Sequence, residues 1–182
     1  MITIRDLTSA DLPAVTTIYA HHILHGTGTF DATPLSLEDM QARADKVSAQ
    51  GLPWLIAEDE AGQVAGYAYA MHFHTRFGWR FTLENSVYIA PDRQRQGIGR
   101  LLLAELIPRC EALGYRQMIA AIGDSENQGS IGLHRALGFE PAGVYKTVGL
   151  KFGRWLDVVL MQKALGEGAS TVPDNSVSPE KA

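Results

Sequence analysis

The sequence predicts an α/β fold of the α+β kind, in which helices flank a central sheet and the elements follow the order βααβββαβαββ. Two observations support this prediction. Short apolar or alternating runs typical of strands separate segments whose apolar residues recur at helical spacing. Two of the apolar runs are joined by a short turn at residues 59–62, which is typical of an antiparallel hairpin.

The first third of the chain is predicted to form one strand and two helices. Residues 2–6 alternate apolar and polar side chains like an edge strand, and capping oxygens at residues 9–11 precede a helix. The apolar face of that helix comprises Leu12, Val15, Ile18 and Tyr19. A capping box at residues 36–39 begins the second helix, which runs to about Ala49.

The remaining elements are predicted from apolar runs and from the glycines that end helices. Gly114 and Gly138 each stand where a helical pattern stops, and glycine readily takes the left-handed conformation found there. Strands are expected at residues 54–57, 63–72, 81–89, 118–122, 144–150 and 155–162, and helices at 97–113 and 130–137.

Length and composition indicate one domain at residues 1–165 followed by a flexible tail at 166–182. A chain of 182 residues with 46% hydrophobic and 20% charged residues can build one packed core. Beyond Leu165 no apolar face recurs, so little surface could be buried to offset the ordering entropy. The net charge of -4 gives no general attraction to nucleic acid or to a membrane, and we expect neither as a partner.

Cysteine, histidine and hydropathy patterns lead us to expect a cytoplasmic protein without a metal site. Cys110 is the single cysteine, and the chain carries no apolar run long enough for a membrane span and no signal sequence at its start. His21, His22 and His25 share a predicted helix at spacings that could bind a metal. The glutamate of a His-Glu-x-x-His site is missing, so surface histidines are the preferred interpretation.

The turn at residues 91–100 joins a predicted strand to a predicted helix and has the composition of a phosphate-binding turn. Gly97 and Gly99 expose backbone amides at a helix N-terminus, where the helix dipole favours an anion. Arg93, Arg95 and Arg100 add positive charge. The turn lacks the Gly-Lys of an ATP-binding loop, and Leu102 occupies the place of the third glycine of a dinucleotide-binding loop. Two glycines by themselves could equally form only a tight bend.

Two motifs resemble the signatures of the GNAT superfamily of acyl-CoA-dependent N-acetyltransferases. Gln94-Arg95-Gln96-Gly97-Ile98-Gly99 is similar to the Q/R-x-x-G-x-G/A loop that holds the CoA pyrophosphate in that family. Residues 127–139 resemble the second signature, N-x-x-S/A followed by a helix that ends in Gly-Phe. The resemblance covers residues 2–165 and implies a mixed, mostly antiparallel sheet and acetyl-CoA as donor. It assigns cofactor binding to Val87, Tyr88, Ile89, Gln94, Arg95, Gln96, Gly97, Ile98, Gly99, Arg100, Asn127 and Ser130.

Three further segments narrow the resemblance to the branch that acetylates phosphinothricin and methionine sulfoximine. These segments are residues 84–89, 130–134 and 151–157. The branch uses small amino-acid-like amines, commonly forms homodimers and works without metal, and we expect the same here. Detoxification of such amino-acid analogues would be the use of this activity.

Acetyl transfer to an amine needs a base, stabilisation of an oxyanion and a proton for the leaving thiolate. Glu84 is the first candidate for the base, since it aligns by resemblance with the catalytic glutamate of the branch; the alternative is a structural ion pair. His134 is the second catalytic candidate, as acid or base, and its alternative is a packed helix histidine. Amides near Val87 and Ile89 would polarise the thioester, and Asn127 could bond pantetheine or cap a helix.

For the acceptor we expect arginines to bind a carboxylate and aromatic residues to form a wall. Arg80 lies four residues before Glu84, which would place both on one face of a strand, and Arg76 is the second candidate. The wall would come from Phe30, Phe73 and Trp79. Residues 72–75 depart from the tryptophan-led sequence expected of the branch.

The expected activity is therefore transfer of acetyl from acetyl-CoA to a small amino-acid-like amine through a tetrahedral intermediate. One alternative is acetylation of a protein N-terminus or of another small amine such as a polyamine. A polyamine pocket should be lined with acidic residues, whereas this segment carries Arg76 and Arg80. The other alternative is a catalytically silent module that binds CoA and regulates a partner.

Overall fold

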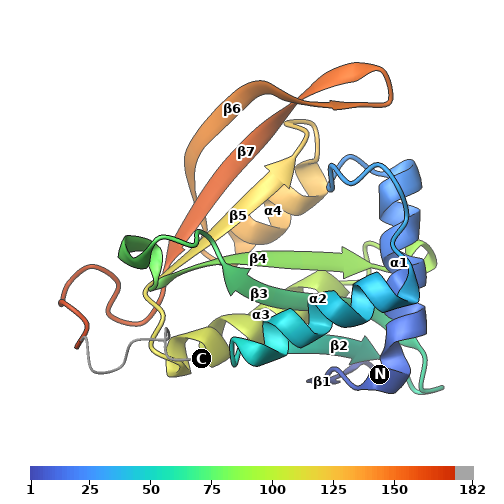
Figure 1. Cartoon of the computed structure of the whole chain (residues 1–182), viewed down its shortest axis with the longest axis horizontal. Helices are drawn as coiled ribbons and strands as arrows, with labels where there is room; N and C mark the ends of the chain where they lie inside the picture. The colour runs from blue at the N-terminus through green and yellow to red at the C-terminus, as the bar shows by residue number, and fades with distance from the viewer. Residues whose placement is uncertain (175–182) are drawn as a thin grey trace.

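The computed structural model describes residues 1–174 and confirms the predicted order of strands and helices (Figure 1). The strands are β1 (Thr3–Asp6), β2 (Trp54–Glu58), β3 (Val64–His72), β4 (Thr82–Ile89), β5 (Gln117–Gly123), β6 (Glu140–Lys151) and β7 (Arg154–Ala164). The helices are α1 (Leu12–His25), α2 (Leu37–Ala49), α3 (Ile98–Ala112) and α4 (Gln128–Ala136).

The strands form one sheet in the order β1-β2-β3-β4-β5-β7-β6, and every neighbouring pair except β4 and β5 is antiparallel. The parallel pairing of β4 and β5 is short, because it joins only residues 82–84 to residues 117–119. Beyond that point β5 turns away with β7, as Figure 1 shows. The sheet therefore splits in its middle, next to Glu84.

Alternating side chains on β3 explain how helices pack on both faces of the sheet. Tyr67 and Tyr69 point to one face, where they stack with Trp54. Tyr19 of α1 lies edge-on to Tyr88 on this aromatic side. The intervening residues of β3 are small (Gly66, Ala68 and Ala70), which leaves room for α3 to contact the strand on the other side.

Local signals in the sequence fix the ends of several helices. Ser36 and Asp39 form the expected capping box, in which the Asp39 amide donates to Ser36 Oγ at 3.1 Å. Gly114 and Gly138 follow α3 and α4 with φ of 87° and 82°, the left-handed conformation that ends a helix. Strand β6 is longer than expected because Gly143 and Thr147 lie at irregular points of its pairing with β7 and interrupt the alternation of side chains.

The first residues of the predicted tail contact the domain. Leu165 is fully buried, and Arg116 donates to the Gly168 carbonyl and pairs with Glu167 at 3.2 Å. Residues 175–182, the rest of that tail, lie outside the described residues. Within residues 1–174 no helix has the length and apolar character required to cross a membrane.

Candidate active site

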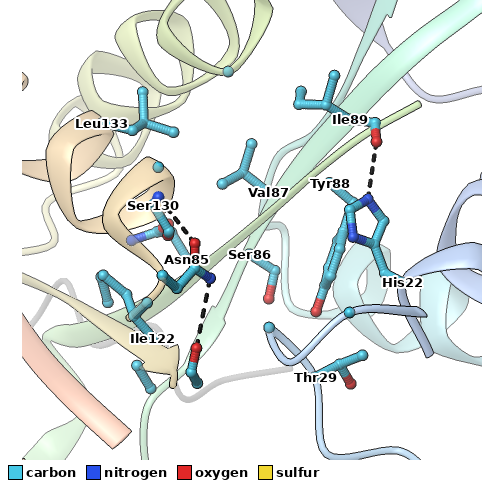
Figure 2. A pocket seen from close by; sticks show the side chains of 18 of the residues that line it. His22, Thr29, Asn85, Ser86, Val87, Tyr88, Ile89, Ile122, Ser130 and Leu133 are labelled. Carbon is cyan, nitrogen blue, oxygen red and sulfur yellow. Dashed lines mark hydrogen bonds between the residues drawn. The ribbon is translucent and has the colours of Figure 1, made fainter. Parts of the chain in front are cut away.

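A cavity of about 1160 Å³ occupies the split between β4 and β5. It extends along β4 from Glu84 to Ile89 and continues to the turn before α3. Figure 2 looks into this space, with Asn85, Ile122 and Ser130 on one side and His22 and Tyr88 on the other. At about 3.3 Å per residue, the stretch of β4 along the cavity spans roughly 17 Å, which suits an extended ligand.

The backbone of β4 directs free amides into the split. Phe73 N donates to Thr82 O and Ala90 N donates to Ala65 O, so alternate residues of β4 bond to β3. The backbone N–H and C=O groups of Val87 and Ile89 therefore point away from β3, towards the side where β5 has separated from β4. These are the amides that the sequence analysis assigned to the thioester carbonyl.

His22 of α1 holds the end of β4, a contact that sequence analysis did not foresee. Its Nε2 donates to the Ile89 carbonyl at 2.9 Å (Figure 2). Burial lowers the pKa of His22, so the neutral ring with its proton on Nε2 is favoured near pH 7. Within residues 1–174 no group of three or more His, Cys, Asp or Glu side chains could hold a metal.

The turn before α3 has the geometry of an anion-binding turn. Arg95 and Gly97 take φ of 60° and 80°, and α3 begins at Ile98 directly after them. Left-handed residues interspersed in such a turn aim successive backbone amides at one point. Arg93 fixes the turn through an ion pair to Asp59 at 2.6 Å. Of the predicted cofactor residues in this turn, Gln94, Arg95, Gly97, Ile98, Gly99 and Arg100 line the cavity.

Gln96 differs from the expectation, since it is exposed and its side chain donates to the Asp92 carbonyl at 3.2 Å rather than lining the cavity. In the turn each residue faces a different direction, so membership of the motif does not place every side chain at the ligand. Gly99 also has a packing role, because a Cβ there would lie 3.0 Å from Leu133 of α4.

Asn127 and Ser130 line the cavity at the start of α4. Asn127 Oδ1 accepts from the Ser130 amide at 3.2 Å, which makes Asn127 the N-cap of that helix. The capping alternative therefore describes its oxygen. Its Nδ2 donates to the Gly123 carbonyl at 3.5 Å with one hydrogen, and the second hydrogen of this amide is the group that a ligand could use.

Glu84 lies at the point where β4 and β5 separate, and its side chain faces the cavity. Among the described residues its carboxylate has no ion-pair or hydrogen-bond partner. The structural ion pair considered as an alternative is thus absent from this part of the chain. Burial raises the pKa of Glu84, as expected for a carboxylate removed from water, and so brings it closer to the range useful for a base.

His134 is 2% exposed, and both of its ring nitrogens lie close to oxygen atoms of the protein. Nδ1 lies 2.8 Å from the Ser130 carbonyl oxygen, and Nε2 lies 3.0 Å from Asn85 Oδ1. A neutral ring carries one proton, so it donates to only one of these two oxygens at a time. Asn85 itself reaches across the split and donates to the Ile119 carbonyl at 3.2 Å (Figure 2). Burial lowers the pKa of His134. The geometry therefore suits a residue that positions Asn85 better than a free acid.

The predicted acceptor residues separate into two groups. Phe30 lines the main cavity, whereas Phe73, Arg76, Trp79 and Arg80 do not. Arg80 follows a single helical turn, Phe77–Trp79, and precedes β4, so the strand alternation expected to align it with Glu84 does not apply. Its guanidinium lies over the rings of Phe77 and Phe81, at 3.9 and 4.6 Å from their centroids.

Arg80 instead lines a smaller cavity of about 220 Å³ that shares Lys46 and Met71 with the main one. Two cations of α2 in the main cavity were missed by sequence analysis: Arg43, which pairs with Asp31 at 3.3 Å, and Lys46. Their three-residue spacing on one face of α2 was the available signal. It is a weak one, because exposed helices commonly carry such charges.

We predict that Arg100→Gln weakens binding of acetyl-CoA about tenfold, since it removes a charge-assisted contact to phosphate at the start of α3. The shift in melting temperature on adding acetyl-CoA measures this loss. Arg135→Gln, an exposed arginine of α4 outside the cavity, is the matched control and should bind normally. Stabilisation of the wild type by NADH or ATP, but not by acetyl-CoA, would contradict the assignment of the turn.

Comparison with known proteins places this geometry in a family. A family model described as acetyltransferase (GNAT) matches residues 18–139. Phosphinothricin N-acetyltransferase of Alcaligenes faecalis is 54% identical over 172 residues, which cover 94% of this chain and 87% of the relative. The L-methionine sulfoximine/L-methionine sulfone acetyltransferase of Pseudomonas aeruginosa is 46% identical over 159 residues, 87% of this chain and 92% of the relative.

A solved structure gives the same result at the level of the fold. The crystal structure of a GNAT superfamily phosphinothricin acetyltransferase from Sinorhizobium meliloti in complex with AcCoA matches with a TM-score of 0.95 and 47% identity. The match covers 99% of this chain and 97% of the other. These similarities show that the chain belongs to the GNAT family of acetyltransferases, and the anion-binding geometry of the turn agrees with them.

Proposed function

We propose that this protein transfers acetyl from acetyl-CoA to the amine of a small amino-acid-like acceptor of the methionine sulfoximine, methionine sulfone or phosphinothricin type. The observation that carries the proposal is the single cavity between β4 and β5. The anion-binding turn lies at one end and the half-buried carboxylate of Glu84, which has no partner within residues 1–174, lies at the other. Relatives that bear the names of these activities support the same acceptor class.

In the proposed reaction, Glu84 accepts the proton of the acceptor ammonium, directly or through water, and frees the nitrogen lone pair. An α-amino group has a pKa near 8, so a base of raised pKa suffices near neutral pH. The amine attacks the thioester carbonyl, and the amides of Val87 and Ile89 stabilise the developing oxyanion. Collapse of the intermediate breaks the carbon–sulfur bond, the attacking nitrogen releases its extra proton, and the leaving thiolate takes up one proton to give the free thiol.

Release of free thiol from acetyl-CoA tests the proposal across amino acids, their sulfone and sulfoximine analogues, polyamines and short peptides. We expect the sulfone and sulfoximine amino acids to be the best acceptors. Turnover restricted to polyamines or peptides would replace the proposed acceptor class. Binding of acetyl-CoA without turnover of any amine would favour the silent CoA-binding module.

We predict that Glu84→Gln lowers kcat about 100-fold or more at neutral pH, the range for loss of one general base, while acetyl-CoA affinity is kept. The same variant should unfold at an equal or higher temperature at pH 7. A raised pKa in the folded state means that folding stability falls as pH rises through that pKa, and glutamine removes this cost. The gain should therefore shrink towards pH 4. If Glu84→Gln keeps a near-normal kcat while His134→Phe is inactive, His134 and not Glu84 is the general base.

The acceptor carboxylate is proposed to lie where the two cavities meet, at Lys46 and next to Arg80. Both cations line the smaller cavity, and Lys46 has no ion pair or hydrogen bond within residues 1–174. Phe30 would form the wall of the acceptor site, while Phe73, Arg76 and Trp79 form the outer rim. Phe73 and Trp79 pack together there, with ring centroids 5.4 Å apart.

We predict that Lys46→Met lowers kcat/KM for methionine sulfone about tenfold, because a charge-assisted contact to the carboxylate is lost. The methyl ester of methionine sulfone is the internal control, and kcat/KM for this ester should differ little between the wild type and the variant. Arg80→Ala should follow the same pattern. An equal loss on acid and ester would mean that these cations support the fold or acetyl-CoA instead.

A homodimer is proposed from the outer hairpin of the sheet. Six apolar side chains of β6, β7 and the turn between them, here named the hairpin patch, are each between 43% and 63% exposed: Val144, Tyr145, Val148, Leu150, Phe152 and Trp155. Single chains rarely expose contiguous apolar surface of this kind, and β6 is also an edge strand of the sheet. A second copy of the chain would cover both.

We predict a solution mass of twice the 19.8 kDa of one chain by light scattering. The double substitution Val148→Glu and Leu150→Lys should shift the protein to the single-chain mass, since it charges the hairpin patch. Leu113→Lys, at an exposed leucine after α3, should leave the mass unchanged. A wild type of single-chain mass would contradict the dimer.

Cytoplasmic location and a use in detoxification stay predictions.

A further inference from the structure

The loop between α1 and α2 crosses from one half of the split sheet to the other. It leaves the end of α1 and extends towards β5 and α4, as Figure 1 shows. Its residues 26–31 all line the main cavity. Figure 2 places Thr29 of this loop across the cavity from Asn85 and Ile122. The loop is therefore a wall of the proposed acceptor site, and what fixes it decides the shape of that site.

The first fixed point is Gly123 on β5. A Cβ at this position would lie 2.2 Å from the Thr27 carbonyl oxygen, far inside contact distance. The backbone of Gly123 does not have a positive φ, so its conformation does not require glycine. The missing side chain is what admits the backbone of the loop to the strand.

The second fixed point is Gly149 on β6, where glycine is again needed because another part of the chain occupies the space of a side chain. A Cβ there would lie 2.0 Å from Cε1 of Phe30, and again φ is not positive. The ring of Phe30 thus occupies the space that a side chain of β6 would fill. Any larger residue at position 149 has to push the ring away.

The third fixed point is a buried ammonium group. Lys151 is 8% exposed and donates from Nζ to the Gly26 carbonyl at 2.8 Å and to the Thr29 carbonyl at 2.7 Å. Within residues 1–174 it forms no ion pair with a carboxylate. A buried cation bound to two carbonyls of one loop holds that loop strongly, because charge-assisted bonds exceed neutral ones in strength. Thr29 is held a second time by Tyr19, whose hydroxyl lies 3.0 Å from Thr29 Oγ1.

We propose that Gly123, Gly149 and Lys151 are positioning residues that dock this loop as a preformed wall, and that the docked ring of Phe30 sets the size of the acceptor. The proposal rests on the proposed function. The three residues come from two strands, β5 and β6, and none of them belongs to the proposed catalytic groups. All three contact residues 26–30. A wall fixed in this way selects acceptors by fit and does not need to close over them.

Gly149→Ala tests the second fixed point. Its methyl group should displace the Phe30 ring and raise KM for methionine sulfone at least tenfold, with KM for acetyl-CoA unchanged. Gly132→Ala is the matched control, because a Cβ at that helical position meets open space and Gly132 does not line the cavity. Larger acceptors such as phenylalanine should gain relative to methionine sulfone in Gly149→Ala.

The double variant distinguishes positioning from a general effect on β6. If Gly149 acts through the ring, Phe30→Ala should behave alike with glycine or alanine at position 149, so the two substitutions are strongly non-additive. Additive losses would overturn this part of the proposal. Lys151→Met should likewise raise the acceptor KM alone, and Lys146→Met, at an exposed lysine paired with Asp157, should not.

Hydrogen exchange gives a readout that does not depend on activity. The amides of Gly26 and Asp31, which donate to the His22 carbonyl and to Thr29 Oγ1, should exchange slowly in the wild type and at least tenfold faster in Gly149→Ala and Lys151→Met, with α3 unaffected. Fast exchange of the loop in the wild type would overturn the fixed wall even if acetyl transfer is found. A slowly exchanging loop in a protein that acetylates no amino acid would leave the docking intact and contradict the proposed function.

Discussion

Backbone N–H and C=O groups on one side of β4 have no neighbouring strand beyond Glu84, and buried polar groups of this kind require other partners. Within residues 1–174, the side chain of His22 donates to the Ile89 carbonyl at the end of this stretch of β4. Across the split, the side chain of Asn85 donates to the Ile119 carbonyl of β5. The amides between them stay available to a ligand. A gap in a hydrogen-bonded sheet thus becomes a site that can bind a carbonyl oxygen.

The split also explains why the cationic turn and the Glu84 carboxylate lie at opposite ends of one cavity. The turn at the end of β4 presents helix amides and arginines, which favour the phosphates of the donor. At the other end Glu84 is removed from water without a cation beside it in the described chain, which raises its pKa. In the proposed reaction, the same strand therefore connects the end that binds the donor phosphates to the end that accepts the proton, and the reacting carbonyl lies between them.

Glycines serve three distinct purposes in this chain. Gly114 and Gly138 end helices because their left-handed φ suits glycine. Gly97 also has a left-handed φ, but it precedes α3 in the anion-binding turn, where its open surroundings leave the amides accessible. Gly123 and Gly149 have no such requirement and are small because another segment occupies the space of their side chain. Only the first two purposes can be inferred from neighbouring residues along the chain.

The sequence by itself determined the order of elements, the helix ends, the phosphate-binding turn and the position of Glu84 at the sheet, because periodicity, caps and short motifs are local. It assumed that Arg80 alternates in one strand with Glu84, whereas Arg80 follows a single helical turn and precedes β4. Tertiary structure alone decided that His134 bonds to Asn85, that His22 holds Ile89, and that Lys151 grips a loop 122 residues away. These contacts depend on how strands separate and loops cross them, and no short window of sequence records such distances.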